Sequence, residues 1–254
     1  TLRTNDAALT ALLQSEGHTV TPGPWAGALV IEFAGSPAAS AAFKEGLFHV
    51  QGLASQLAAL CVDAKPGQQV LDLCAAPGGK SLTLAECMQD NGRLVSGEFA
   101  PSRVPLLQKA FDRCGITCAV AVENNAAVHN NTWPKFDRVL CDVPCSGLGV
   151  IAKKPDIRYK DLDGIENLLD TQQKILQNGA DSLAENGRLV YSTCTVNVQE
   201  NQNQVEKFLS ANPDFHLVQP ESALPGADIT PLGTVFLPHK TGTDGFFAAI
   251  LERN

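Results

Sequence analysis

The sequence is short of positive charge and has no long apolar run. Lysine and arginine together number 19 against 27 aspartate and glutamate residues, which gives a formal net charge of −8. Because affinity for nucleic acid depends on cations that neutralise phosphates, this balance argues against general nucleic-acid binding but allows a local basic patch. The chain has no stretch of about 18 apolar residues and no secretory signal, so we expect no membrane-spanning helix.

The eight cysteines include no C-x-x-C pair. Because that spacing is typical of structural zinc sites, its absence argues against a zinc centre. Several cysteines lie in apolar runs, where a free thiol behaves as a small hydrophobic side chain. Without a secretory signal, we expect reduced thiols and a cytoplasmic location. The first residue is not methionine, and we expect that an upstream piece has been removed.

Short apolar runs alternate with amphipathic stretches along most of the 254 residues. We predict strands at 28–33, 69–74, 94–98, 117–122, 138–142, 188–192, 215–218 and 246–251, an extended or hairpin segment at 46–51, and helices at 54–62, 81–89, 102–114, 165–183 and 200–210. A further helix begins after Asn5 and ends near Gly17. Strands that alternate with helices imply an α/β fold with a parallel sheet, here over residues 46–254, preceded by a small α+β module at 1–45.

Residues 70–80 combine a buried strand, a glycine turn and the start of a helix. An apolar run bounded by turn residues is typical of a parallel strand covered on both faces. Gly78 and Gly79 let the backbone approach a ligand closely, and the first N–H groups of the helix can bind it. Open α/β sheets bind nucleotide-like cofactors at this place, whereas a tight turn without a ligand is the purely structural alternative.

Two cofactors are compatible with this turn. Residues 79–81 resemble the end of a phosphate-binding P-loop, and Asp142 after an apolar strand would be its metal-binding partner. A P-loop, however, requires a glycine where Cys74 stands. The other cofactor is S-adenosylmethionine, which requires an acid at the end of the second strand to bind the ribose hydroxyls, and Glu98 lies there.

Two cysteines and an aspartate come at the ends of two other predicted strands. Asp142 and Cys145 follow one strand, and Cys194 follows another. Since the carboxyl ends of parallel strands meet at one edge of a sheet, we expect all three side chains near the glycine turn. A single cysteine of this kind is more often an inert buried thiol than a nucleophile. Two of them beside an acid and a cofactor turn favour catalysis.

This set of groups suits the methylation of a pyrimidine ring carbon. A thiolate that adds to carbon 6 of cytosine converts the ring into an enamine, whose carbon 5 can attack a sulfonium methyl group. A carboxylic group near nitrogen 3 stabilises the adduct, and a second group helps to remove the proton from carbon 5. Sequence chemistry alone does not say whether Cys145 or Cys194 is the nucleophile.

The runs at 71–80, 142–146 and 192–195 resemble the Nop/Sun family of RNA 5-methylcytosine methyltransferases, most closely its bacterial RsmB (Sun/Fmu) type, which modifies small-subunit ribosomal RNA. Further similar stretches lie at residues 2–5, 154–158, 200–201 and 244–247, so the resemblance covers essentially the whole chain. It implies a Rossmann-like methyltransferase sheet, mostly parallel with an antiparallel last strand, S-adenosylmethionine as cofactor and RNA as substrate. Bacterial members also have an upstream helical RNA-binding domain, so we expect that domain or a partner to act with this chain.

The resemblance also implies roles for single residues. Cys194 matches the family's nucleophile, Cys145 the thiol that assists product release, and Asp142 an acid between the target base and the cofactor. Glu98 matches the ribose-binding acid, and Asn124 stands where the family usually has an acid near the adenine. The other cofactor-binding positions are Cys74, Ala75, Ala76, Pro77, Gly78, Gly79 and Lys80.

The cations expected to bind RNA follow Cys145 in the sequence. They are Lys153, Lys154, Arg158 and Lys160, and Arg3, His239 and Lys240 are candidates to join them in space. Such a patch would hold phosphates and carry little sequence information, and for each cation a solvated surface position is the alternative. Two other functions stay open: a nucleotide hydrolase, and an RNA-binding scaffold without catalytic activity.

Overall fold

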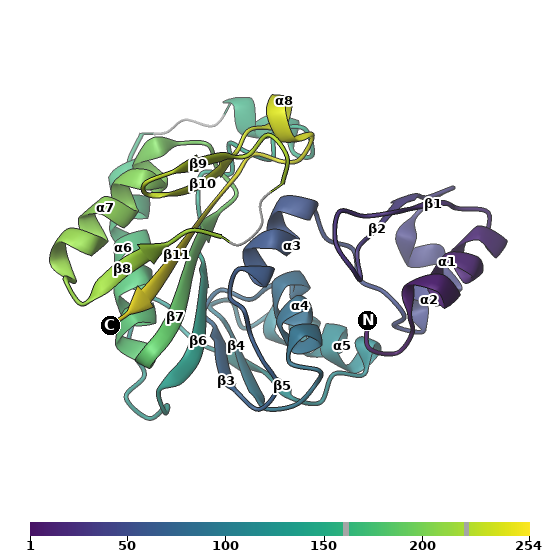
Figure 1. The fold of residues 1–254 in the computed structure, drawn as a ribbon, viewed down its shortest axis with the longest axis horizontal. Coiled ribbons are helices and arrows are strands. Elements are labelled where there is room, and N and C mark those ends of the chain that lie inside the picture. Colours follow the sequence, from purple (N-terminus) through teal and green to yellow (C-terminus); the bar gives the residue numbers. More distant parts are fainter. Residues whose placement is uncertain (160–162, 221–223) are drawn as a thin grey trace.

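The computed structural model describes residues 1–159, 163–220 and 224–254. Lys160, one of the four cations predicted to bind RNA, lies outside the described residues. A large sheet with helices on both faces forms most of the molecule, and the N-terminal elements lie to one side of it (Figure 1). This arrangement of sheet and helices confirms the predicted α/β fold with a Rossmann-like, mostly parallel sheet.

Five parallel strands form one side of the nine-stranded sheet that the described residues make, in the order β5–β4–β3–β6–β7 with β5 at the edge. Their bounds are β3 (Gln69–Asp72), β4 (Arg93–Glu98), β5 (Ala119–Glu123), β6 (Phe136–Asp142) and β7 (Leu183–Thr193). After β3 the chain adds β4 and β5 on one side of β3, and it then adds β6 on the other side of β3. The crevice at the carboxyl ends of β3 and β6 is therefore a topological switch point, where folds of this kind bind ligands.

The rest of the sheet is antiparallel. β11 (Phe246–Arg253) pairs with β7, from Phe247 opposite Thr193 to Glu252 opposite Arg188. On the other side of β11 lie β8 (Phe215–Val218) and β10 (Gly233–Phe236), and β9 (Asp228–Thr230) pairs with β10. The antiparallel last strand is confirmed. β9 and β10 are not among the predicted strands, because three or four residues are too few to show an alternating pattern.

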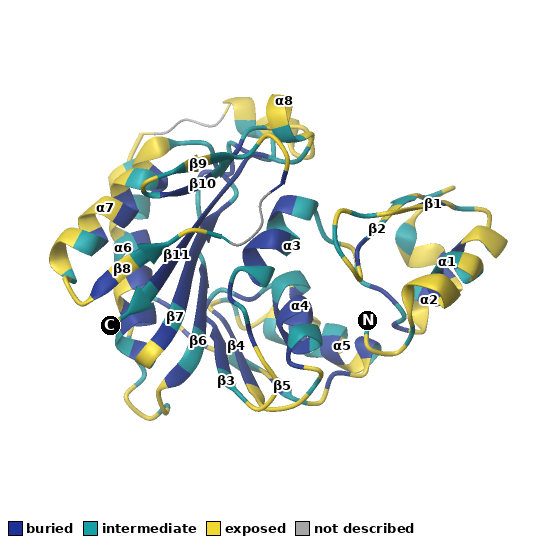
Figure 2. Ribbon diagram, viewed as in Figure 1, coloured by how far each residue is buried: buried dark blue, intermediate teal, exposed yellow. Residues whose placement is uncertain are grey.

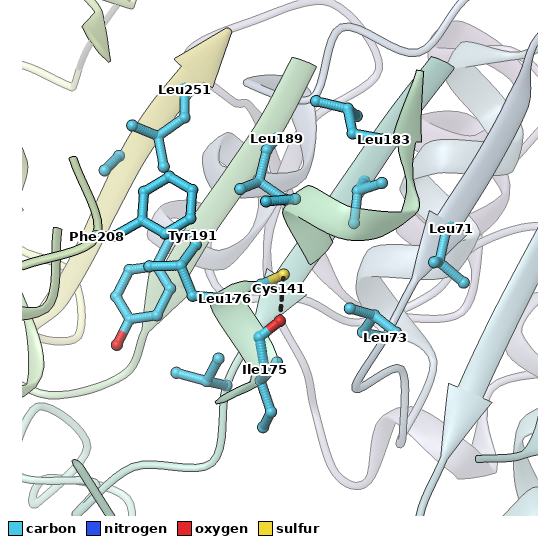
Figure 3. Packing of buried hydrophobic residues seen from close by; sticks show 14 of the residues in the cluster. Leu71, Leu73, Cys141, Ile175, Leu176, Leu183, Leu189, Tyr191, Phe208 and Leu251 are labelled. Carbon is cyan, nitrogen blue, oxygen red and sulfur yellow. Dashed lines mark hydrogen bonds between the residues drawn. The ribbon is translucent and has the colours of Figure 1, made fainter. Parts of the chain in front are cut away.

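Helices cover both faces of the sheet, with their bounds close to the predicted ones. They are α3 (Leu53–Leu60), α4 (Gly79–Cys87), α5 (Val104–Cys114), α6 (Ile165–Ser182) and α7 (Gln202–Ala211). Side chains alternate along each strand, so Leu71 packs in the cluster with α6 and α7 while Val70 packs with α4 and α5. Figure 2 shows β3, β4, β6, β7 and β11 buried along most of their length. Figure 3 shows the cluster that contains Leu71, on the face covered by α6 and α7. In this cluster the Cys141 thiol donates to the Ile175 carbonyl at 3.8 Å.

The N-terminal elements have a small core of their own. α1 (Asp6–Ser15) begins after Asn5, whose side chain accepts the Ala8 N–H at 2.9 Å. The antiparallel pair β1 (Thr19–Pro22) and β2 (Leu29–Glu32), η1 (Pro37–Ala39) and α2 (Ala41–Lys44) follow. The buried residues of this core are Leu9, Leu13, Val20, Ala42 and Phe48. Residues 46–51, all of them described, form no strand, so the hairpin alternative is wrong, while the extended alternative and the division into 1–45 and 46–254 stay predictions.

Short helical turns complete the fold: η2 (Pro155–Tyr159), η3 (Val198–Glu200) and α8 (Pro238–Thr241). Within residues 1–159, 163–220 and 224–254, none of the helices combines the length and the apolar character needed to cross a membrane.

Candidate active site

The turn from β3 into α4 is tight and depends on one glycine. Gly78 has a φ of 108°, in the left-handed region that side chains disfavour, and a Cβ there would lie 2.9 Å from Leu107 Cδ1. The Gly78 N–H donates to the Ala75 carbonyl at 2.8 Å, and Ala75 N–H donates to Gly97 at the same distance. As a result α4 starts at Gly79, two residues earlier than predicted, and its first N–H groups lie at the carboxyl end of β3.

Two polar side chains at the ends of the next strands flank this turn. Glu98 ends β4, and its Oε1 accepts the Ala100 N–H at 2.8 Å and lies 3.4 Å from Arg103 Nη1. Asn124 follows β5, and its buried Nδ2 has no hydrogen-bond partner among the described residues. A Cβ on Gly97 would come within 3.3 Å of that nitrogen. A buried donor without a partner is costly in a protein alone, so a polar ligand would satisfy it.

The sequence analysis missed one buried acid at the base of the turn. Asp72 is fully buried, and its Oδ2 accepts the Ser81 hydroxyl at 2.7 Å while its Oδ1 accepts the Cys74 N–H at 3.4 Å. The Ser96 hydroxyl donates in turn to Ser81 at 3.0 Å. Burial raises the pKa of Asp72 to about 7. These contacts join the turn to the first turn of α4, and an acid inside an apolar strand is the signal that could have revealed them.

Asp142, at the end of β6, lies between a cation and a hydroxyl. Lys80 Nζ is 2.7 Å from Asp142 Oδ2, and the Ser192 hydroxyl at the end of β7 donates to Oδ1 at 2.8 Å. Lys80 Nζ also lies 5.2 Å from the centre of the Phe246 ring. Lys80 was predicted for the cofactor alone, but its ammonium group contacts the aspartate. The pair therefore joins the glycine turn to the ends of β6 and β7.

The two thiols predicted to act in catalysis lie side by side, with Cys145 Sγ and Cys194 Sγ 3.3 Å apart. A hydrogen bond from the Cys145 thiol lowers the pKa of Cys194, and the positive charge of Lys80 acts in the same direction, against burial and the negative charge of Asp142. The same hydrogen bond and burial raise the pKa of Cys145. Cys194 is therefore the thiol of the pair that ionises first, and the thiolate is the nucleophilic form.

The predicted RNA-binding cations follow Gly149, whose N–H donates to the Cys194 carbonyl at 3.0 Å. Lys153, Lys154 and Arg158 are all exposed, and the last lies in η2. Lys153 Nζ forms an ion pair with Asp244 Oδ2 at 2.6 Å, so part of its charge is neutralised. Of these three described cations, Lys154 and Arg158 therefore carry the charge that is not offset by a carboxylate.

Arg3 does not join this patch. Its Nη1 donates to the carbonyls of Glu45 at 3.0 Å and Arg113 at 2.9 Å, at the carboxyl end of α5. Helices between parallel strands run against them, so this end of α5 lies at the opposite edge of the sheet from the thiols. Lys240 forms an ion pair with Asp228 at 2.8 Å.

The fold and the site together define a Rossmann-like methyltransferase. The chain belongs to the RsmB/F family, since the family model described as 16S rRNA methyltransferase RsmB/F matches residues 59–252. This assignment confirms the resemblance stated above, and S-adenosylmethionine is the cofactor expected for such a family.

Individual relatives agree with this assignment. The chain is 37% identical to a Bacillus subtilis protein named probable ribosomal RNA small subunit methyltransferase B, over all of the chain and 59% of that protein. The crystal structure of PH0851 superposes with a TM-score of 0.94 and 32% identity, over all of this chain and 58% of the other. NSun6 from Pyrococcus horikoshii, solved with SFG, shares the fold with a TM-score of 0.88 and 22% identity, over all of this chain and 88% of the other. The chain thus spans a little under two thirds of the curated relative's length.

Proposed function

We propose that this chain transfers the methyl group of S-adenosylmethionine to carbon 5 of a cytosine in RNA, through a covalent adduct with Cys194. The observation that carries the proposal is the pair of thiols 3.3 Å apart beside the Lys80–Asp142 ion pair, at the same sheet edge as the glycine turn. The names of the relatives support small-subunit ribosomal RNA as the substrate.

The residues around the glycine turn fit the cofactor. S-adenosylmethionine, when bound, supplies an electrophilic methyl group on a sulfonium. Residues 74–80 would line its site, and Glu98, which is 6% exposed, would accept hydrogen bonds from ribose hydroxyls. Asn124 would donate its unpaired Nδ2 hydrogen to an adenine ring nitrogen, and its amide oxygen could accept from the amino group.

The Lys80–Asp142 pair would select cytosine. The ammonium group is a donor and the carboxylate an acceptor, 2.7 Å apart. Cytosine has an acceptor at nitrogen 3 next to a donor at its amino group, which complements this order. Uracil has the opposite order and would place donor against donor. Leaving buried polar groups unpaired in this way is the basis of strong discrimination by enzymes.

The thiols would divide the covalent chemistry between them. The Cys194 thiolate adds to carbon 6, and the electron pair of the ring double bond moves so that carbon 5 attacks the methyl group. While Cys194 is bonded to carbon it carries no negative charge, so the charge that raises the pKa of Cys145 is absent and Cys145 can lose its own proton to solvent. The Cys145 thiolate then accepts the proton from carbon 5, the double bond re-forms, and Cys194 leaves as a thiolate.

We test this function with labelled cofactor and RNA, followed by nucleoside analysis for 5-methylcytidine. The wild type is expected to produce it, Cys194→Ala to lose at least about 10³-fold of the rate, and Cys145→Ala to form an RNA adduct that survives denaturing gel electrophoresis. Normal methylation by Cys194→Ala would refute the assignment of the nucleophile. Cofactor binding without transfer would favour the scaffold, and magnesium-dependent ATP hydrolysis the hydrolase.

Three further parts of the proposal concern the surroundings of the reaction. Lys154 and Arg158 would hold RNA phosphates, and the Tyr159 ring, 81% exposed, would stack on a base. The module at 1–45 would act with the catalytic domain at 46–254, and an upstream domain or a partner protein would add RNA affinity. A cytoplasmic location would keep both thiols reduced.

A further inference from the structure

A buried carboxylate lies behind the two thiols. Glu200, the last residue of η3, has 0% of its surface exposed. From the described residues its carboxylate accepts the Ser146 N–H at 2.7 Å, the Ser146 hydroxyl at 2.5 Å, Gln172 Nε2 at 3.0 Å and Asn197 Nδ2 at 3.2 Å. A buried carboxylate is stable only when its oxygens accept hydrogen bonds. The network therefore holds the donor groups in place as well as the carboxylate of Glu200.

The donors belong to the segments that carry the thiols. Ser146 directly follows Cys145, and Gln172 also donates to the carbonyl of Pro144 at 3.0 Å. The residues on both sides of Cys145 are therefore held by Glu200 and its partner on α6.

The segment that carries Cys194 is joined to the same carboxylate. Asn197 lies three residues after Cys194, and Thr195 Oγ1 is 2.8 Å from the hydroxyl of Ser146. The Tyr191 hydroxyl, on β7, donates to the Glu200 carbonyl at 2.7 Å. The Glu200 side chain therefore connects two segments that follow different strands: the segment after β6, which carries Cys145, and the segment after β7, which carries Cys194.

We propose that Glu200 is a positioning residue that sets the spacing of the Cys145 and Cys194 sulfur atoms, and thereby the rate at which the methylated RNA is released. This inference rests on the proposed function. Methyl transfer requires Cys194 and the bound cofactor, whereas release also requires Cys145 within reach of the carbon 5 proton. Because Glu200 holds the backbone on one side of Cys145 directly, loosening it affects release more than transfer.

The first experiment separates the two steps in Glu200→Gln. An amide keeps the shape of the side chain, but its NH₂ group replaces one of the two oxygens that accept from Ser146, so a donor would face a donor. We expect single-turnover methyl transfer within about threefold of the wild type, and steady-state turnover lowered about tenfold or more with RNA adduct accumulating, since a ~1 Å misplacement can cost up to 10²-fold. Glu200→Asp, which keeps the charge, is expected to recover part of the release rate.

Gln173→Ala is the matched control. Gln173 is the neighbour of Gln172 on α6, and its Nε2 donates to the Gln204 carbonyl at 2.8 Å rather than to a segment that carries a thiol. This variant loses comparable polar contacts and should release RNA at the wild-type rate. If it accumulates adduct as Glu200→Gln does, the effect is general loosening and the inference is wrong.

A second readout does not depend on methyl transfer. Phenylarsine oxide binds two thiols that lie close together, so its affinity reports the spacing of the sulfur pair, with Cys145→Ala as the blank. We expect weaker binding by Glu200→Gln, measured at a temperature at which the variant is fully folded, and unchanged affinity would overturn the inference. If the wild type binds the arsenical but transfers no methyl group, the proposed function fails while the positioning result stands. Should Glu200→Gln not fold, Ser146→Ala, which removes the hydroxyl that contacts Glu200 and Thr195 but keeps the backbone N–H contact, is expected to give the same two changes at smaller size.

Discussion

Single residues decide which thiol is charged. Cys145 and Cys194 have the same chemistry in isolation, and both are partly buried. Their difference comes from neighbours: the Cys145 thiol donates to Cys194 and lowers its pKa, and Lys80 acts in the same direction, against burial and the Asp142 carboxylate. The assignment of Cys194 as nucleophile in the sequence analysis came from a resemblance; the direction of this pKa shift is consistent with that assignment, which stays a proposal.

This asymmetry predicts a pH dependence of alkylation. Cys194 should react with iodoacetamide at a lower pH than an ordinary cysteine, because its pKa is lowered. In Cys145→Ala the donor is gone, the thiolate is less stable, and the midpoint of the alkylation profile should move to higher pH. Quantitative mass spectrometry of the peptides measures it, with Cys118, whose pKa burial raises to about 12, as an internal reference. An unchanged midpoint would show that the hydrogen bond does not control ionisation.

At the scale of elements, the turn between β3 and α4 contains two adjacent glycines with different requirements. Gly78 has a positive φ and no room for a Cβ, whereas a Cβ on Gly79 would meet only ordinary contacts at 3.7–3.8 Å with Gln51. The sequence pattern treats the two as equivalent. The structure distinguishes them, because only the first reverses the chain direction.

A pair of alanine substitutions follows from this difference. Gly78→Ala should lower the free energy of unfolding by about 1–2 kcal/mol, the cost of the left-handed conformation, with more from the contact with Leu107. Gly79→Ala, at the first helical position, should change it by less than about 0.5 kcal/mol, as expected away from strained positions. Urea denaturation measures both. Equal losses for the two variants would mean that the conformation of Gly78 is not the cause.

At the scale of the whole molecule, the net charge is negative but one segment presents exposed positive charge. The chain carries a formal charge of −8, yet Lys154 and Arg158 lie exposed in the segment that follows Cys145. Two other cations are paired with carboxylates, Lys153 with Asp244 and Lys240 with Asp228. RNA would therefore bind at one edge of the sheet and be repelled by most of the remaining surface.

The salt dependence of RNA binding tests this distribution. Lys154→Ala and Arg158→Ala should each weaken RNA binding and reduce the slope of log affinity against log salt by about 1. The reason is that each of the removed side chains displaces one counterion from a phosphate when RNA binds. Lys240→Ala is the control, since its charge is paired with Asp228, and should leave the slope unchanged. Fluorescence anisotropy at several salt concentrations gives the slopes. Equal reductions for all three variants would point to net charge rather than a local patch.

Much of the fold could be predicted because its signals are local. The parallel strands and their helices follow from apolar runs and turn residues, and their bounds agree within a few residues for α6 and β4. The strands that were missed are β1, β9 and β10, each three or four residues long, and short helical elements such as α2 and α8 were missed as well. Of the two alternatives predicted for 46–51, the hairpin is wrong, because the segment does not pair as a strand.

The sequence by itself determined which chemical groups come at strand ends: the glycine turn, Asp142, Cys145 and Cys194. Periodicity and turn residues act over a few positions, so these placements need no knowledge of distant contacts. Only the tertiary structure decided that Lys80 contacts Asp142, that the sulfur atoms are 3.3 Å apart, and that Glu200 joins their segments. Those distances depend on the order of strands in the sheet and on packing between residues far apart in the chain, which no local pattern encodes.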